Sequence, residues 1–440
     1  MKRDIDAKLS VWKTKKDRRP LLIKGARQVG KSTSIEAFGK SQFDKVVSVN
    51  FEQRPEFKNC FESLIPQEII ESISLLSKTD ITAGDTLLFL DEIQECPEAI
   101  MAMRYFYEQM PDLHVIGAGS LLEFALKAEN FRMPVGRVEF EFMNPMSFGE
   151  FLCAIGEEAL RNRVRELRNK PLPSSVHDRL MGYIQKYALL GGMPAVIKYY
   201  IQTGKINGSL DIQSTLSQGF IADFGKYSSK IRQKYILKIF QAVPKMVGRK
   251  FKFSNVDSTI QSRDLKEALE LLEMAGIVQI VRATSGSGLP LKAEESERIF
   301  KVLFLDIGIM QNMCGLSREL GSKSAIMQIN KGALAEQLIG QELLCIQPSH
   351  QPPTLHYWSR EQKNSSAEID YLIAIDDEPV PIEVKSGKRG TLKSLTLFKE
   401  RYSPRWMVRF YSSAIEVEGD LVSLPLYASE SLNQRLGTAL

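Results

Sequence analysis

The residues Gly25-Ala26-Arg27-Gln28-Val29-Gly30-Lys31-Ser32 decide the fold, because they fit the phosphate-binding pattern G-x-x-x-x-G-K-[ST]. The glycines let the backbone turn so that successive N–H groups face a polyphosphate. In such a loop Lys31 can reach the β- and γ-phosphates, and the Ser32 hydroxyl can bind Mg²⁺. A strand is predicted over 20–24 and a helix from Thr33, whose N-terminal dipole favours anions. The sequence therefore predicts that Gly25 to Thr33 bind a nucleotide.

Length and composition describe an ordinary globular chain. Its 440 residues predict more than one domain, and 43% of them are hydrophobic and 25% charged. No run approaches the roughly 18 apolar residues of a membrane span, and we expect no signal peptide. The five cysteines are scattered and the four histidines lack metal-ligand spacing, which is typical of a reduced, cytoplasmic protein. The net charge of +5 permits a nucleic-acid partner without indicating one.

The first third of the chain alternates between strands and helices. Strands are predicted over 44–51, 86–90 and 114–120, with helices over 66–78 and 99–109 between them. This alternation predicts a parallel α/β sheet, in which functional residues collect at the carboxyl ends of the strands.

Two acids follow the apolar strand 86–90. Asp91 can hold Mg²⁺ near the phosphates, directly or through water, and Glu92 can act as the general base that polarises the attacking water. Ser120 ends the next strand and can either sense the γ-phosphate or cap the following helix. Arg137 is a candidate arginine finger, the alternative being an arginine in a surface turn.

Helices dominate from about residue 144 to 243, and a second pattern follows. An amphipathic helix over 262–276 precedes a strand over 277–282, and this order of helix, helix and hairpin is that of a winged helix. A basic cluster, Lys245, Arg249, Lys250 and Lys252, either contacts DNA or is a solvated surface.

The last part of the chain places acids on neighbouring strands. Glu368-Ile369-Asp370 is followed by Glu383-Val384-Lys385, and residues two apart on a strand share a face. We expect Asp370 and Glu383 to meet around one divalent metal, with Lys385 beside the attacking water and Glu336 on the preceding helix as a further ligand. The arrangement resembles the PD-(D/E)XK core of restriction endonucleases. The domain then either cleaves DNA or keeps the fold and binds DNA or protein without cutting.

The phosphate loop also resembles that of a bacterial and archaeal branch of AAA+-like ATPases, whose loop reads G-x-R-Q-x-G-K-[ST]. The resemblance continues through five further stretches, which are 90–94, 119–120, 136–137, 144–151 and 191–194. It implies an α/β P-loop ATPase domain, which we place at 1–150, followed by a helical lid at 151–232. A winged helix at 233–296 and a restriction-endonuclease-like α/β domain at 297–440 would complete the chain.

The resemblance further implies ATP and Mg²⁺ as cofactors and a homo-oligomer in which Arg137 acts across subunits. The resemblance of the last domain to nucleases implies DNA, branched or single-stranded, as a partner. ATP-driven rearrangement would gate the nuclease-like domain. In the alternative, the protein is a nucleotide-dependent switch or scaffold that does not cleave. The chain departs from the branch at Ala118, where a threonine usually precedes Gly-Ser.

Overall fold

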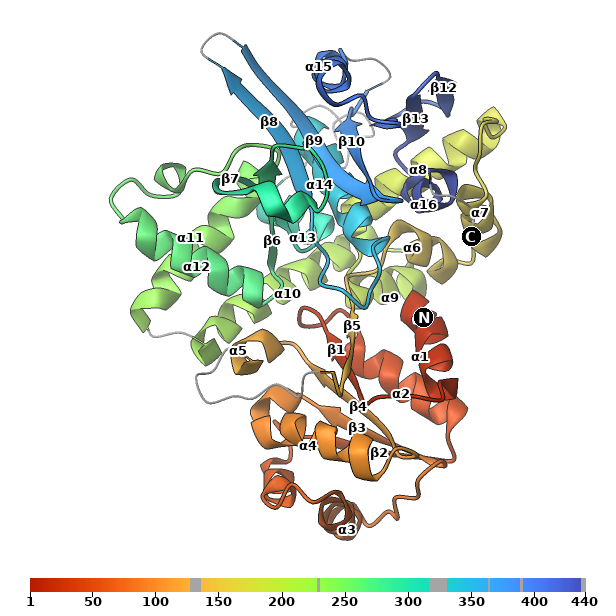
Figure 1. The fold of residues 1–440 in the computed structure, drawn as a ribbon, viewed down its shortest axis with the longest axis vertical. Coiled ribbons are helices and arrows are strands. Elements are labelled where there is room, and N and C mark those ends of the chain that lie inside the picture. Colours follow the sequence, from red (N-terminus) through yellow and green to blue (C-terminus); the bar gives the residue numbers. More distant parts are fainter. Residues whose placement is uncertain (127–135, 228–229, 316–330, 363–364, 388–390, 437–440) are drawn as a thin grey trace. The chain divides into compact units, whose positions relative to one another are not determined.

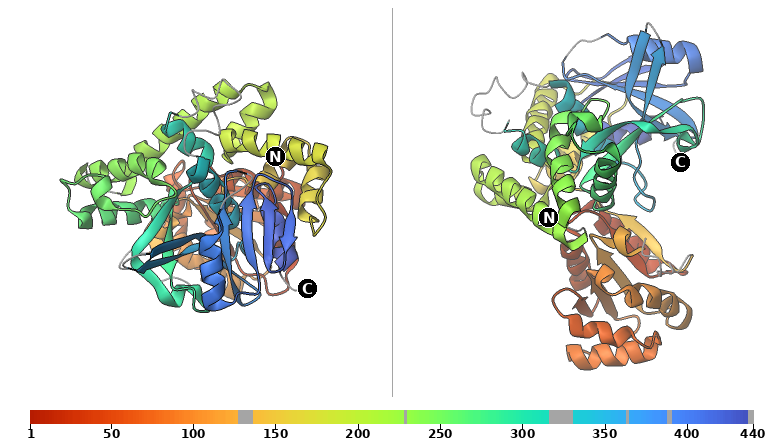
Figure 2. Two further views of the ribbon diagram at one scale, coloured as in Figure 1. Left: turned by 90° about the horizontal axis from the view of Figure 1, so that it is seen from above. Right: turned by 90° about the vertical axis from the view of Figure 1, so that its left-hand side faces the viewer.

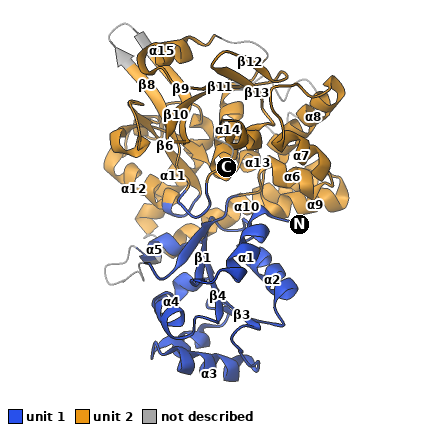
Figure 3. Cartoon of the chain, turned by 45° about the vertical axis from the view of Figure 1, so that its right-hand side comes forward, with its two compact units in different colours: residues 1–144, 274–276, 348–352 blue, residues 145–273, 277–347, 353–440 orange. Residues whose placement is uncertain are grey.

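The computed structural model describes residues 1–126, 136–227, 230–315, 331–362, 365–387 and 391–436. The chain divides into two compact units, which Figure 3 shows in different colours. The first comprises residues 1–144, 274–276 and 348–352, and the second comprises 145–273, 277–347 and 353–440. Among the helices in these described ranges, none has both the length and the apolar character that crossing a bilayer requires.

The first unit is a parallel α/β layer structure built as the sequence predicts. Its five strands are hydrogen-bonded in the order β2-β3-β4-β1-β5, and every neighbouring pair is parallel. Its elements are α1 Asp4–Thr14, β1 Leu21–Lys24, α2 Lys31–Gln42, β2 Lys45–Asn50, α3 Pro66–Ser77, β3 Thr86–Asp91, α4 Pro97–Gln109, β4 His114–Gly119, α5 Leu122–Leu126 and β5 Glu139–Phe142.

Helices cover both faces of this sheet, which explains why the interior strand β3 is apolar from Leu87 to Leu90. Every residue from Thr86 to Leu90 in β3 is buried. Leu87 lies on the face of α2, near Gly39, whereas Leu88 packs in the core that includes residues of α3 and α4. Successive side chains of a strand point to opposite faces, so a strand covered on both sides must be apolar at every position.

The second unit joins a helical segment to a large mixed sheet (Figure 1). Its helices are α6 Phe148–Ala154, α7 Glu158–Arg165, α8 Ser174–Leu190, α9 Pro194–Thr203, α10 Ile206–Tyr227, α11 Lys230–Met246, α12 Ser262–Met274, α13 Ile307–Met313, α14 Lys331–Cys345, α15 Lys393–Tyr402 and α16 Leu432–Leu436. Its strands are β6 Val278–Thr284, β7 Glu295–Phe304, β8 His356–Gln362, β9 Ser365–Ile375, β10 Glu378–Val384, β11 Met407–Tyr411, β12 Glu416–Glu418 and β13 Leu421–Pro425.

The hairpin predicted as the wing of a winged helix belongs to this sheet. The strand order is β12-β13-β11-β10-β9-β8-β6-β7, so the green β6 and β7 continue the blue strands in Figure 2. Arg282 to Thr284 of β6 pair in parallel with His356 to Trp358 of β8. The domain border expected between residues 296 and 297 therefore falls inside β7. Local sequence could not reveal this pairing, because β6 and β8 are about 70 residues apart in the sequence.

Polar side chains of α14 fasten the helical segment to the sheet. Gln337 binds both the N–H and the carbonyl of Phe304, at 2.9 and 2.7 Å. Gln341 accepts from the Ile307 N–H at 3.0 Å. Glu342 is fully buried, and its two oxygens accept from the Phe148 N–H at 2.9 Å and the Ser429 hydroxyl at 3.1 Å. These bonds satisfy backbone groups at Phe304, Ile307 and Phe148, and the side-chain hydroxyl of Ser429.

Glu342 gives this unit a pH-dependent stability. Burial raises the pKa of Glu342 from 4.5 to about 7. Between these values the folded state binds more protons than the unfolded state, so the free energy of unfolding falls as the pH rises from about 4.5 to 7. We expect Glu342→Gln, which can keep both hydrogen bonds, to stabilise the protein at pH 8 by on the order of 2 kcal/mol and to flatten this dependence. Urea unfolding at several pH values measures the effect.

The exposed Glu166, whose side chain is 68% accessible, is the control, and we expect Glu166→Gln to leave the pH dependence unchanged. A loss of stability in Glu342→Gln at pH 8 would show that the carboxylate charge is needed.

Candidate functional site

The phosphate loop lies between β1 and α2, as the sequence predicts. Gly30 has φ 98° and directly precedes α2, so the N-terminus of that helix opens onto the loop. Lys31 is buried, and its Nζ donates to the carbonyls of Gly25 and Ala26, both at 2.8 Å. Burial lowers the pKa of Lys31 to about 8, although Glu92 and Asp91 favour the ammonium form. The ammonium group thus lies within the curve of the loop.

Two contacts that the sequence did not predict hold the loop. A Cβ on Gly25 would lie 2.2 Å from the Met143 carbonyl oxygen, so only glycine allows this approach. The buried guanidinium of Arg3 donates to the carbonyl oxygens of Val29, at 2.7 Å, and Asn144, at 2.8 Å. Arg3 is 26 residues from Val29, and no local signal connects them.

Asp91 lies beside Ser32, as expected of two ligands of one cation. The Ser32 hydroxyl donates to Asp91 Oδ1 at 3.0 Å, and Asn50 donates to Oδ2 at 3.0 Å. Asn50 and Asp91 pair directly across β2 and β3, which explains the second contact. Burial raises the pKa of Asp91, and the hydrogen bond from Ser32 opposes that shift. Asn50 is a further member of the site that the sequence analysis missed.

Glu92 is held by its neighbours at the end of β3. Its backbone has φ 49°, an uncommon conformation for a residue other than glycine, and the Gln94 amide donates to its Oε2 at 2.7 Å. The Ser120 hydroxyl lies 3.5 Å from the same oxygen, at the limit of a hydrogen bond. A Cβ on Gly119 would lie 2.2 Å from Gln94 Oε1, so glycine there leaves room for Gln94. The structure thus brings Glu92 and Ser120 together beside the loop.

Arg137 does not join this group within the chain. β5 pairs in parallel with β1, with Glu139 opposite Leu21 and Phe142 opposite Lys24. The phosphate loop follows Lys24 at the carboxyl ends of these two parallel strands, whereas Arg137 precedes Glu139 at their amino ends. Arg137 Nε instead donates to Glu108 Oε1 at 2.9 Å. An arginine-finger role for Arg137 would have to be toward another subunit.

Two of the three carboxylates predicted to bind a second metal, those of Glu336 and Asp370, lie beside a lysine instead, together with Glu368. Lys301 Nζ, on β7, lies 2.8 Å from Glu336 Oε1, 2.6 Å from Glu368 Oε1 and 3.7 Å from Asp370 Oδ1. Burial disfavours the charged form of Lys301, but these three acids outweigh it and raise its pKa. Asp370 Oδ2 accepts from the Val384 N–H at 2.8 Å.

Glu383 and Lys385 form an ion pair at the end of β10. The pKa of Glu383 is raised to about 7, first by burial and then by Asp370. Glu383 Oε2 is buried and makes no hydrogen bond within the described residues. Over the same described ranges, no three His, Cys, Asp or Glu side chains are grouped so as to hold a metal. The expected set of Glu336, Asp370 and Glu383 is therefore not gathered around one point. Glu336 and Asp370 lie beside the Lys301 ammonium group, whereas Glu383 pairs with Lys385.

A β-bulge shapes this cluster. Trp358 pairs with Ile369 and His356 with Leu372, so Asp370 and Tyr371 of β9 lie opposite the single residue Tyr357. Asp370 approaches Lys301, and the Tyr371 hydroxyl donates to the Glu336 carbonyl at 2.8 Å. Strict alternation along β9 would have directed these two side chains to opposite faces.

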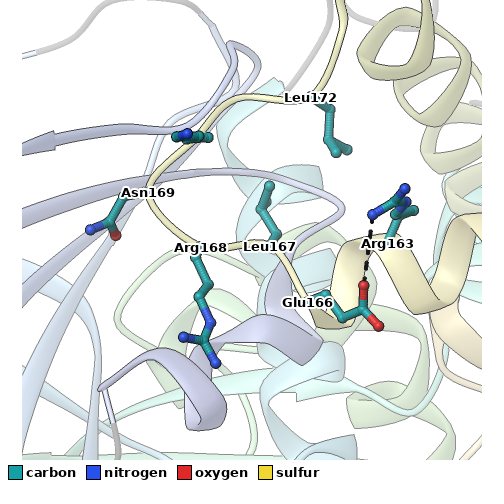
Figure 4. Close-up of a pocket in the computed structure, with 7 residues that line it drawn as sticks. Arg163, Glu166, Leu167, Arg168, Asn169 and Leu172 are labelled. Atoms are coloured by element: carbon teal, nitrogen blue, oxygen red, sulfur yellow. Dashed lines mark ion pairs between the residues drawn. The ribbon is translucent and has the colours of Figure 1, made fainter.

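A pocket of about 390 Å³ lies apart from these residues, beside α7 and the segment that follows it (Figure 4). Its lining residues are Arg163, Glu166, Leu167, Arg168, Asn169, Lys170 and Leu172. Arg163 and Glu166 form an exposed ion pair at 3.9 Å. None of the predicted site residues lines this pocket, and we assign it no function.

The sheet order of the first unit, the glycine loop before α2 and the acids after β3 define a P-loop ATPase domain. Residues 17–152 match the sequence family described as an AAA domain, which agrees with that class. Residues 181–320 and 331–427 match two families that are each described as a domain of unknown function. No curated protein sequence matches the chain.

Several solved structures are similar to parts of the chain. A Walker-type ATPase of Pyrococcus abyssi is 17% identical, and the match covers 71% of this chain and 95% of the chain of that ATPase, with a TM-score of 0.45. The Aeropyrum pernix ORC1 protein in complex with DNA is 13% identical, with coverages of 72% and 92% and a TM-score of 0.30. The Thermotoga maritima RuvB Holliday junction branch migration motor is 12% identical, with coverages of 62% and 88% and a TM-score of 0.31.

Proposed function

We propose that this protein binds ATP together with Mg²⁺ in the first unit and hydrolyses it. The observation that carries the proposal is the meeting of Lys31, Ser32 and Asp91 at the N-terminus of α2. A helix N-terminus and a buried ammonium group favour a polyphosphate. Ser32 Oγ and Asp91 Oδ1 lie 3.0 Å apart, and both are oxygen ligands of the kind that Mg²⁺ prefers. When bound, the metal would supply positive charge next to the phosphates.

Each residue of the site has a distinct task in this proposal. The loop N–H groups and Lys31 bind the phosphates, while Ser32 and Asp91 hold the metal. Glu92 orients and deprotonates the attacking water, and Gln94 fixes the direction of the Glu92 carboxylate. The Ser120 hydroxyl lies 3.5 Å from Glu92 Oε2, beside the carboxylate that acts on the water. Arg3 and Asn50 act indirectly, since they position the loop and Asp91.

Replacement of Lys31 tests the proposal. We expect Lys31→Met to weaken ATP binding and to lower ATP hydrolysis by about 100-fold, because the buried ammonium is lost from the phosphate site. Titration with a fluorescent ATP analogue and a phosphate-release assay measure the two effects. The control is Lys40→Met, because Lys40 is exposed at the far end of the same helix. If folded Lys31→Met protein hydrolyses ATP at the wild-type rate, the site is assigned wrongly.

We further infer that ATP hydrolysis changes the state of the second unit, whose partner is DNA. The support is the basic cluster at the C-terminal end of α11 and just after it, where Lys245, Arg249 and Lys252 are exposed. The alternative is a nucleotide-dependent switch that binds a protein partner, and the lysine among the C-terminal acids favours a unit that does not cleave. The phosphate-release assay, repeated with branched, single-stranded and double-stranded DNA, separates the two. Stimulation supports the DNA partner, and an unchanged rate with every DNA supports the switch.

A further inference from the structure

The Lys301 side chain is built into the interior of the second unit. Only 2% of its surface is exposed, and it extends from β7 within the eight-stranded sheet. Its Nζ lies 5.1 Å from the centre of the Tyr357 ring, at a distance suited to a cation–π contact. A lysine enclosed in this way cannot swing into solvent without opening the packing around it. Its ammonium group is therefore a fixed part of the cluster.

The ammonium group occupies the place that a divalent cation would need. Glu336 and Glu368 are both within hydrogen-bonding distance of Nζ, and Asp370 is 3.7 Å away. Divalent cations bind carboxylate oxygens at roughly 2.0–2.6 Å, so an ion shared by these acids would lie within a few ångströms of Nζ. In a buried site the repulsion between two such cations is weakly screened. Metal and ammonium are thus mutually exclusive.

We propose that Lys301 is a resident cation that replaces the divalent metal of this acidic cluster, so that the natural protein binds no catalytic metal there. The unit then cannot cut phosphodiester bonds through Asp370, Glu383 and Lys385. Instead, Lys301 pairs with Glu336, Glu368 and Asp370, and Lys385 pairs with Glu383. This inference does not depend on ATP chemistry, because every residue in it belongs to the second unit.

The test is a titration of nucleotide-free full-length protein with Mn²⁺, in which electron paramagnetic resonance measures the bound and free metal. We expect the wild type to bind no Mn²⁺ that depends on Asp370, so Asp370→Asn leaves its titration unchanged. We expect Lys301→Met to gain a site that binds Mn²⁺ at least about tenfold more tightly, because the competing charge is gone. The added Asp370→Asn change should remove that site again. Lys399→Met, which removes a half-exposed surface lysine, controls for the change in net charge and should gain nothing.

Two results would overturn the proposal. One is Mn²⁺ binding by the wild type that disappears in Asp370→Asn, which would show that a metal coexists with Lys301. The other is folded Lys301→Met protein with no gain in Mn²⁺ binding, which would show that the ammonium does not exclude the metal. The comparison of wild type with Asp370→Asn does not require Lys301→Met to fold, so the proposal stays testable in either case.

Discussion

The Glu92→Gln variant is expected to bind ATP with nearly wild-type affinity but to hydrolyse it about 10²–10⁴-fold more slowly. The amide of Gln can keep the hydrogen bond with Gln94 but cannot accept a proton from water. Because Glu92 does not hold the phosphates in the proposed mechanism, binding and catalysis should separate. Equilibrium titration with a fluorescent ATP analogue and single-turnover hydrolysis measure the two properties.

Glu95 offers a matched control for this experiment. It follows Glu92 by three residues, and its side chain is 44% exposed in a surface pair with Lys58. We expect Glu95→Gln to leave both binding and hydrolysis unchanged. Hydrolysis by Glu92→Gln within threefold of the wild-type rate would rule out Glu92 as the general base.

The Glu430→Ala variant is expected to lose about 3 kcal/mol of stability, because it breaks a buried ion pair. Glu430 accepts from Arg161 Nη2 at 2.5 Å and from Arg165 Nε at 3.1 Å. The Arg161 side chain is 6% exposed, so loss of Glu430 removes the carboxylate from a buried guanidinium. A Cβ on Gly149 would lie 2.1 Å from Glu430 Oε1, which shows how closely α6 approaches this pair. Urea unfolding and thermal melting measure the loss.

The exposed pair of Arg163 and Glu166 provides the comparison, since their side chains are 72% and 68% accessible. We expect Glu166→Ala to change stability by less than about 0.5 kcal/mol, because solvent screens such pairs. If Glu430→Ala is no more destabilising than Glu166→Ala, the buried pair adds nothing to stability.

The first unit could be predicted closely from the sequence, since its signals are local and agree with one another. These signals are the glycine loop, the helix after Lys31 and the apolar strand before Asp91. Each of them spans only a short stretch of consecutive residues. The parallel sheet then brings Ser32, Asp91, Glu92 and Ser120 together at the carboxyl ends of its strands. Arg3 and Asn50 could not be found, because their partners are brought near only by the tertiary fold.

The second unit shows where local patterns fail. A helix, a helix and a hairpin have the same sequence pattern whether the hairpin stands alone or, like β6 and β7, continues a sheet. The acids on β9 and β10 were recognised as a cluster, but the cation among them comes from β7. The spacing of Asp370 and Glu383 says nothing about Lys301, which precedes Asp370 by 69 residues. A bulge that turns Asp370 and Tyr371 to one side leaves no mark on residue type.

The polar side chains of α14 limit how this chain can change over evolution. The regions 181–320 and 331–427 match separate families, as though they were independent modules. Yet Gln337 and Gln341 of the second region satisfy backbone groups at Phe304 and Ile307 of the first. Exchange of either region alone would leave those groups buried without partners. The two regions are therefore expected to be inherited, and to vary, as a single module.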